Sequence, residues 1–234
     1  MAAGTPVRIL LVRHGETVFN VEGRWQGQSD SPLTERGLAQ ARELARALAD
    51  EPIAAIYSSD LGRALHTARE VAAVHTVPVT ADRRLREIDT GAWTGKSRAE
   101  ITVEFPGGLE AWATRPAGMR LPRGETLAEA QARALSFFAE RMPAHAGQTL
   151  AEGTPGYTGQ TVVVISHGAI GQAILISAMG GTLDDLWLEQ RVDNCQISRL
   201  EWTPTRGLRL VQLSDVRHLE DVGSLGSWRT TDAA

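Results

Sequence analysis

Two short, largely apolar runs, Val7–Val12 and Val162–Ile165, constrain the fold of this chain more than any other feature. Each run is too short for a typical helix and is rich in branched aliphatic residues, which is typical of a strand buried on both faces of a sheet. Helical patterns lie between these runs and further strand candidates. Because buried strands that alternate with helices favour a parallel sheet, we predict an α/β fold, a three-layer α/β/α sandwich with a mostly parallel central sheet.

The other elements follow from apolar runs, helical periodicity and capping signals. Further strands are expected at Ile53–Tyr57, Pro78–Thr80, Cys195–Trp202 and Leu208–Leu213. Helices are expected at Thr34–Asp50, after a cap at Asp60, from the capping box of Thr126 and Glu129 to about Met142, and at Ala169–Met179. In the helix after Asp60, the stripe predicted to be buried consists of Leu61, Leu65, Ala68 and Ala72. Irregular structure is expected at 87–122, which contains several Gly and Pro residues.

The length of 234 residues and the apolar fraction of 42% suit one domain with its own core, which we assign to residues 1–234. A Gly-rich stretch at 147–160 is expected to be a mobile surface insertion, and the tail 223–234 is expected to be loose. The single cysteine, Cys195, cannot form an intrachain disulfide and is expected to be a small core residue. With neither a signal-peptide core nor a membrane-spanning run in view, we expect a cytoplasmic protein that does not bind membranes.

The charged residues restrict the kind of ligand. There are 24 Lys plus Arg and 28 Asp plus Glu, and the resulting net charge of −4 argues against a broad nucleic-acid-binding surface. Every basic residue except Lys96 is an arginine. Guanidinium groups stay protonated and bind oxyanions through two parallel hydrogen bonds. A local cluster of arginines can therefore bind a small anion although the whole chain is acidic.

The two apolar runs end in the same way. Val7–Val12 leads into Arg13-His14-Gly15, and Val162–Ile165 leads into Ser166-His167-Gly168. The carboxyl ends of parallel strands form the ligand-binding edge of an α/β sheet, so both histidines are expected at that edge. A single histidine in such a place is more often structural than functional, but two in matched positions indicate a ligand site.

With two further motifs, these residues resemble the histidine phosphatase superfamily, which has the phosphoglycerate mutase-like fold. The resemblance runs from about Val7 to His218 and rests on four motifs in the family's order. They are Arg13–Thr17 with Asn20, Tyr57–Ala64, Leu85–Ile88 followed by Gly91–Gly95, and Ser166–Gly168. Four ordered motifs are a much more specific signal than the Arg-His-Gly triplet alone.

The resemblance implies catalytic roles for five residues. His14 would be the nucleophile that becomes phosphohistidine, because a neutral imidazole is nucleophilic near pH 7. Arg13, Arg63 and a protonated His167 would surround the transferred phosphoryl group and stabilise its charge. Glu87 would act first as general acid toward the leaving group and then as general base toward water.

The resemblance also implies substrate-binding residues. Asn20 and the backbone N–H of Gly168 are expected to donate hydrogen bonds to the phosphate. Gln26 and Gly27, in the segment Arg24–Gly27, are expected to contact the substrate and to contribute to selectivity.

A second segment expected to set selectivity is Trp93–Arg123. It contains three arginines that either meet a substrate carboxylate or are solvated loop charges, namely Arg115, Arg120 and Arg123. Near the C-terminus, His218 resembles part of a family segment that closes over the substrate.

The resemblance favours a metal-independent phosphatase that hydrolyses small phosphomonoesters and uses no cofactor. The residues after Glu87 lack the Arg, His and Tyr that family mutases carry there. Candidate substrates carry a carboxylate, such as phosphoserine or a phosphoglycerate derivative. A 2,3-bisphosphoglycerate-dependent phosphoglycerate mutase is the alternative, and a non-catalytic module that senses phosphate or binds protein is a third reading.

Other ligand classes have weaker support. The stretch Thr90–Ser97 ends like a Walker A loop, but Thr90 stands where the first glycine of that motif belongs. No zinc-binding motif is present, so we expect no metal site. The predicted partner is a small phosphomonoester and not a nucleic acid, and the sequence leaves open whether the chain forms a homodimer.

Overall fold

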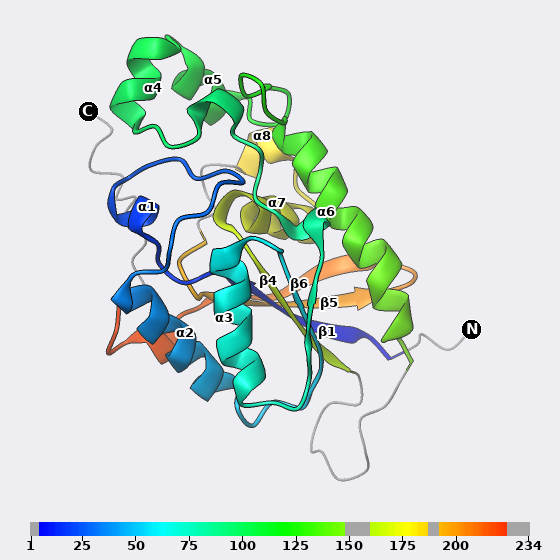
Figure 1. The fold of residues 1–234 in the computed structure, drawn as a ribbon. Helices are drawn as coiled ribbons and strands as arrows, with labels where there is room; N and C mark the ends of the chain where they lie inside the picture. Colours follow the sequence, from blue (N-terminus) through cyan, green and yellow to red (C-terminus); the bar gives the residue numbers. More distant parts are fainter. Residues whose placement is uncertain (1–4, 148–159, 187–191, 224–234) are drawn as a thin grey trace.

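The structure is a computed structural model that describes residues 5–147, 160–186 and 192–223 (Figure 1). Within these residues, six strands form one sheet in the order β3-β2-β4-β1-β5-β6. They are β1 (Val7–Arg13), β2 (Ile53–Ser58), β3 (Val79–Ala81), β4 (Thr161–Ser166), β5 (Ile197–Thr203) and β6 (Gly207–Asp215). Every predicted strand is present, and its ends differ from the prediction by two residues or fewer.

The sheet is mostly parallel, as predicted. Strand β4 pairs in parallel with β1 and β2, and β2 pairs in parallel with β3. Strand β5 runs antiparallel to both β1 and β6. The connection between Thr203 and Gly207 is too short for a crossover and therefore forces a hairpin. The register pairs Arg13 with Ser166, so β1 and β4 end at the same level.

Helices cover both faces of the sheet and complete three layers (Figure 1). Ile9 and Leu11 of β1 pack in the core that contains α6 (Leu127–Arg141) and α7 (Gly168–Ala178). Leu10 and Val12 face the other way, toward α2 (Glu35–Leu48) and α3 (Gly62–Ala73). The alternation of side chains along a strand thus divides the apolar residues between two cores. The predicted capping box of Thr126 and Glu129 is present at the start of α6.

Short helices lie around this framework. They are α1 (Val18–Val21), α4 (Arg98–Glu104), α5 (Gly108–Thr114), α8 (Leu183–Leu186) and the 3₁₀ turns Arg83–Leu85, Gly91–Trp93, Met142–Ala144 and Arg217–Leu219. The prediction of irregular structure at 87–122 was therefore wrong for α4 and α5. Each has seven residues, which is too short to show a reliable periodicity. A local signal existed, because Ser97 and Glu100 form a capping box at the start of α4.

Helix α3 differs from its prediction in two ways. Its first N–H, that of Gly62, donates to Asp30 from a distant loop at 2.9 Å, whereas the predicted cap, Asp60, forms an ion pair with Arg86 instead. The buried face contains Arg63, Ala64, Thr67, Ala68 and Val71, while Leu65 and Ala72 are only partly buried. The buried face of the helix is therefore rotated relative to the predicted face, because the polar residues Arg63 and Thr67 face inward.

Two predictions concern residues that the structure mostly leaves out. Residues 148–159 of the predicted insertion and residues 224–234 of the predicted loose tail lie outside the described residues. The single domain over 1–234 accordingly stays a prediction. Among the residues that were described, no helix is long and apolar enough to cross a membrane.

Candidate active site

The ends of β1 and β4 place His14 and His167 side by side. The centroids of the two imidazole rings lie 5.2 Å apart. The backbone N–H of His14 donates to the carbonyl of Ser166 at 3.0 Å, which continues the strand pairing by one residue. Both histidines are buried, with exposed fractions of 2% and 0%. Residues that are 153 positions apart thus meet at the carboxyl edge of the sheet.

His14 has the geometry of a neutral nucleophile. Its Nδ1 lies 2.7 Å from the carbonyl oxygen of Gly15, which can only accept, so Nδ1 carries the proton. The Nε of Arg63 donates to His14 Nε2 at 3.2 Å, so Nε2 carries a lone pair. Burial, followed by the charges of Arg63 and Arg13, lowers the pKa of His14 well below its usual 6.5. The ring is therefore neutral at pH 7, and the lone pair on Nε2 is directed at the Arg63 guanidinium.

The Arg63 guanidinium is held rigidly although it lies on a helix start. Its Nη1 donates to the carbonyl of Ser29 at 2.6 Å and its Nη2 to the carbonyl of Gly27 at 2.7 Å. Burial lowers the pKa of Arg63 to about 10, so the group keeps its charge at neutral pH. The carbonyl of Gly27 thus orients a catalytic candidate, a contact that the sequence did not predict for this residue.

Arg13 lies on the other side of the histidines. Its Nη1 donates to the carbonyl of Val192 at 2.7 Å, while its buried Nε has no partner in the described structure. The Arg13 side chain packs against Gly168, because a Cβ added there would lie in ordinary van der Waals contact with that Nε, at 3.4 Å. Burial lowers the pKa of Arg13 from its usual value, and the charge of Glu87 counteracts this effect.

His167 is neutral in the ligand-free site. Burial, and then the charges of Arg63, His14 and Arg13, lower its pKa well below 6.5. The imidazolium expected around a bound phosphoryl group stays a prediction, because a phosphate would bring negative charge next to the ring. Both ring nitrogens are buried, and neither has a partner among the described residues. Buried polar atoms without partners are rare and indicate a place for a ligand.

The carboxylate of Glu87 lies at the start of α7. It accepts hydrogen bonds from the backbone N–H groups of Ile88, Ala169 and Ile170, each at 3.0 Å. A helix N-terminus favours negative charge, and here the protein's own carboxylate takes that position. The N–H groups of 169 and 170 are therefore used within the protein, which leaves Gly168 as the donor predicted for phosphate. The charge of Glu87 also acts on Arg13 and Arg63, so it belongs to the same cluster.

Asn20 is connected to the site through a residue that the sequence analysis missed. Its Oδ1 accepts from the backbone N–H of Thr17 at 3.1 Å and from Asn194 Nδ2 at 3.4 Å. The same Nδ2 donates to the carbonyl of His14 at 2.9 Å. Asn194 is fully buried and supports the main chain of the nucleophile candidate from 180 residues away. Nothing local distinguishes it from an ordinary turn residue before β5.

The two segments expected to set selectivity pack against each other. The indole of Trp25 meets those of Trp93 and Trp112 at centroid distances of 5.0 and 5.6 Å. The backbone N–H of Gly95 donates to the carbonyl of Trp25 at 2.7 Å. Gln26, next in the chain, is buried, and its Oε1 has no partner in the described structure. Figure 1 shows α4 and α5 together at one end of the molecule, close to the start of α6.

The structure also describes the surroundings of Arg120, Arg123, His218 and Cys195. Arg120 is exposed and forms an ion pair with Glu129, and Arg123 is exposed with a left-handed φ of 62°. His218 Nε2 lies 3.0 Å from the carbonyl oxygen of Cys195. Its 3₁₀ turn packs against α2. Cys195 is buried, as expected.

The Walker-like stretch has other contacts in the structure. Lys96 forms an ion pair with Glu104 at 2.6 Å, and Ser97 caps α4, so neither residue forms a phosphate loop. The described residues include no group of three or more His, Cys, Asp and Glu side chains that could hold a metal ion.

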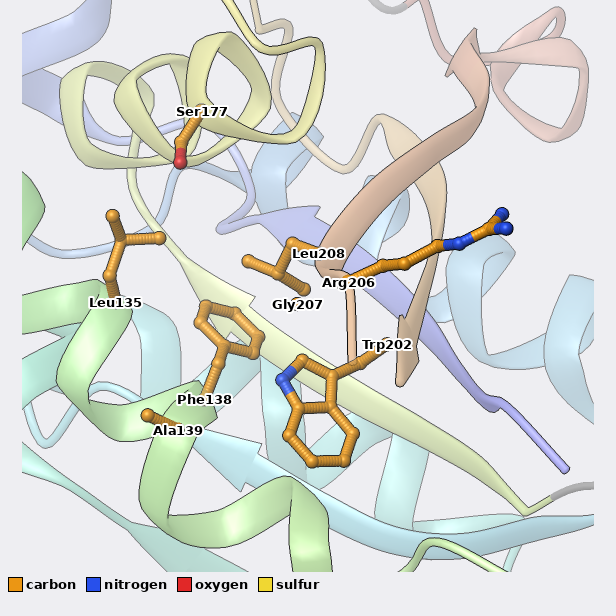
Figure 2. A pocket seen from close by; sticks show the side chains of 8 residues that line it. All are labelled: Leu135, Phe138, Ala139, Ser177, Trp202, Arg206, Gly207 and Leu208. Atoms are coloured by element: carbon orange, nitrogen blue, oxygen red, sulfur yellow. The ribbon is translucent and has the colours of Figure 1, made fainter. Parts of the chain in front are cut away.

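A cavity of about 280 Å³ lies at the opposite end of the sheet (Figure 2). Its walls come from α6, α7 and the β5–β6 hairpin, and Phe138 and Trp202 face the same space. Trp202 pairs with Val7 at the start of β1, so this cavity is separate from the histidines at the strand ends.

Comparison with known proteins identifies the family. The family model described as "Histidine phosphatase superfamily (branch 1)" matches residues 9–215. The chain belongs to the histidine phosphatase superfamily, which confirms the resemblance seen in the sequence.

Relatives and solved structures agree with this assignment. "Phosphoserine phosphatase 1" of Hydrogenobacter thermophilus is 38% identical over 144 residues, which is 62% of this chain and 68% of that protein. "Probable phosphoglycerate mutase GpmB" of Yersinia pestis is 39% identical over 123 residues, 53% of this chain and 57% of that protein, so the match spans little more than half of this relative.

Among solved structures, Bacillus stearothermophilus YhfR has a TM-score of 0.81 and 33% identity, covering 92% of this chain and all of that one. Mycobacterial glucosyl-3-phosphoglycerate phosphatase Rv2419c has a TM-score of 0.77 and 29% identity, covering 88% of this chain and 97% of that one.

Proposed function

We propose that this protein is a metal-independent phosphatase that hydrolyses small phosphomonoesters through a phosphohistidine on His14. The observation that carries the proposal is the neutral His14 ring, whose Nε2 lone pair faces the buried Arg63 guanidinium. A phosphoryl group placed there would meet the nucleophile and two cations together. Positioning and electrostatic stabilisation supply most of the catalysis in phosphoryl transfer.

In the first step, His14 Nε2 attacks phosphorus in line with the leaving oxygen. The N–P bond forms while the P–O bond to the alcohol breaks, and the alcohol oxygen takes a proton from the carboxyl group of Glu87. Arg13, Arg63 and His167 hold the phosphoryl oxygens. The unpaired nitrogens of His167 and the unpaired Nε of Arg13 are suited to this contact, because a phosphate would satisfy them.

In the second step, water attacks the phosphohistidine. The carboxylate of Glu87 accepts a proton from water as the new O–P bond forms, and the electron pair of the N–P bond returns to His14. One carboxyl group can serve both steps because the first step leaves it deprotonated.

For the substrate we propose a phosphomonoester that carries a carboxylate, such as phosphoserine or a phosphoglycerate derivative. The names of two relatives, a phosphoserine phosphatase and a glucosyl-3-phosphoglycerate phosphatase, support this class. A phosphoglycerate mutase is the second candidate, because of the relative described as GpmB. Both candidates use the same phosphohistidine and differ in whether water or a bound phosphoglycerate receives the phosphoryl group.

A phosphate-release screen in the presence of EDTA tests the proposal. The substrates are phosphoserine, phosphoglycerates, sugar phosphates and nucleotides. We expect release from at least one small phosphomonoester, and we expect His14→Ala to abolish it. Activity that persists in purified His14→Ala would overturn the nucleophile, and isomerisation of phosphoglycerate faster than phosphate release would favour the mutase. Phosphate binding without turnover of any substrate would favour a non-catalytic module.

A further inference from the structure

The segment that carries Glu87 lacks regular secondary structure at the residues around it. It follows the 3₁₀ turn Arg83–Leu85, so strand or helix partners do not fix its carbonyl groups. Two side chains hold part of this main chain: Ser166 Oγ donates to the carbonyl of Leu85 at 2.9 Å, and Gln28 Nε2 to that of Glu87 at 3.2 Å. Most of the remaining contacts come from one arginine of α6.

Arg133 uses all five of its N–H donors in this region. Its Nη1 donates to the carbonyls of Arg84 and Arg86 at 2.8 and 2.9 Å, and its Nη2 donates to the carbonyl of Glu87 at 3.3 Å. The remaining donors bind Glu125, through Nε to Oε1 at 3.1 Å and through Nη2 to Oε2 at 2.9 Å. A guanidinium has five donors in a fixed plane, so this set leaves none free.

Glu125 extends the contact to the residues after Glu87. Its Oε2 accepts from the backbone N–H of Asp89 at 2.9 Å, and its own N–H donates to the carbonyl of Asp89 at 3.0 Å. Arg133 and Glu125 therefore form hydrogen bonds to the main chain on both sides of Glu87. The Glu87 carboxylate lies between these anchors at the start of α7.

We propose that Arg133 is a positioning residue that acts through Glu87, by holding its backbone so that the carboxyl group can reach the leaving oxygen. This inference rests on the proposed phosphatase function and deepens it. Side chains that transfer protons need accurate placement, and small displacements reduce rates strongly. Among the described residues, Arg133 has no hydrogen bond to His14, Arg13 or Arg63. Of the charges that lower the pKa of His167, that of Arg133 contributes least. Its main effect is therefore expected on proton transfer, and Arg133→Lys, which keeps the charge, separates the two effects.

The dependence of the rate on the leaving group tests this role. A nitrophenyl phosphate releases a stable anion and needs little help from an acid, whereas an alkyl phosphate needs a proton on its oxygen. The ratio kcat/KM covers substrate binding and the transfer to His14, so later hydrolysis does not obscure it. For Arg133→Gln we expect kcat/KM to fall about 10- to 100-fold with an alkyl phosphate and less than about 3-fold with nitrophenyl phosphate.

Two further variants sharpen the test. Arg133→Lys keeps the charge but not the planar fork, so it should show the same selective loss in a chain whose folding is less disturbed. Glu87→Gln should lower the rate with the alkyl phosphate. The double variant with Arg133→Gln should be little slower than Glu87→Gln alone, because both substitutions remove the same function, proton transfer by Glu87.

The matched control is Arg209→Gln. Arg209 is an exposed arginine on the edge strand β6, and it also forms an ion pair with a glutamate, Glu201 of β5, at 2.9 Å. It should leave both rates unchanged. Equal losses with both substrates, or no loss, in the Arg133 variants would overturn the positioning role while the wild type remains a phosphatase. Absence of phosphate release by the wild type would overturn the proposed function, and this inference with it.

Discussion

Arg63 Nε donates a hydrogen bond to His14 Nε2 at 3.2 Å, and two carbonyl groups hold the rest of the guanidinium in place. In the ligand-free protein, Arg63 thus directs the imidazole ring, and burial together with the Arg63 charge lowers the pKa of His14, so the ring is neutral. A phosphoryl group that enters between them would exchange this weak contact for a charge-assisted one. The proposed nucleophile and a cation are therefore arranged before the substrate binds, which would reduce the reorganisation needed in the reaction.

Replacing Arg63 tests this arrangement. We expect Arg63→Gln to lower kcat/KM about 100- to 1000-fold, because it removes a cation from the transferred phosphoryl group. Steady-state kinetics with the best substrate of the screen measure this loss. Arg69→Gln, an exposed arginine on the same helix, is the control and should retain the wild-type rate. A small loss in Arg63→Gln would show that Arg13 alone carries the phosphate.

Gly27 should tolerate a side chain poorly. It has a φ of +52°, and an added Cβ would lie 2.1 Å from Thr90 Oγ1, so something must shift. We expect Gly27→Ala to lower the free energy of unfolding by about 2–4 kcal/mol, from backbone strain plus this overlap, and to lower activity by moving the carbonyl that holds Arg63.

Gly23→Ala is the matched control for Gly27→Ala. Gly23 has a φ of +65° but open space at its Cβ, so only the strain remains, about 1 kcal/mol. Urea denaturation measures both variants. Equal losses would contradict the steric argument, and Thr90→Ala added to Gly27→Ala should recover part of the difference.

Stability should fall as the pH is lowered through the usual histidine range. The folded-state pKa values of His14 and His167 lie well below 6.5, because burial and nearby arginines disfavour the charged rings. Below about pH 6.5 the unfolded chain therefore binds protons that the folded chain excludes, and each ring reduces stability by about 1.4 kcal/mol per pH unit until its folded pKa is reached.

Denaturation curves between pH 7.5 and 5, at intervals of about half a unit, measure this slope. His167→Gln should reduce the slope, whereas His66→Gln, at an exposed position of α3, should leave it unchanged. A flat pH profile in the wild type would contradict the assignment of neutral rings.

Asn194 should matter for activity although it lies outside every motif. Asn194→Ala removes the donor to the carbonyl of His14, and we expect a loss of about 1–3 kcal/mol in stability and about tenfold in kcat/KM. Gln40→Ala is the control, because Gln40 is equally buried and also binds backbone groups, those of Glu16 and Gly223. Gln40→Ala should lose as much stability as Asn194→Ala but much less activity. Similar kinetic losses in both would mean that Asn194 acts only through folding.

Much of the framework could be predicted because its signals are local. The strands at 7–13 and 161–166 appear as apolar runs, and the capping box at Thr126 appears as a pattern of four residues. The motif residues were identifiable for a similar reason, since the functional groups lie next to strand ends or helix starts. His14 and His167 could be placed together because parallel strands bring their carboxyl ends to one edge.

Helices α4 and α5 were missed because they are short. The differences at α3 have another cause, a partner that is distant in the sequence. Asp30 replaces Asp60 at the start of α3, and Arg63 with Thr67 turns that helix toward the site. The pKa of His167 is lowered first by burial and then by the charges of Arg63, His14 and Arg13, all of which come from other parts of the chain. No periodicity within a helix reveals such contacts.

The sequence by itself determined the order of the strands and the longer helices, the α/β class, and the residues that match the motifs of the family. Only the tertiary structure decided how these side chains are held: Glu87 at the N-terminus of α7, Asn194 beneath His14, and Arg133 around the Glu87 segment. The physical reason is that apolar patterning and capping act over a few residues. Hydrogen bonds to buried main-chain groups, in contrast, join whatever polar side chains the packed layers bring within about 3 Å.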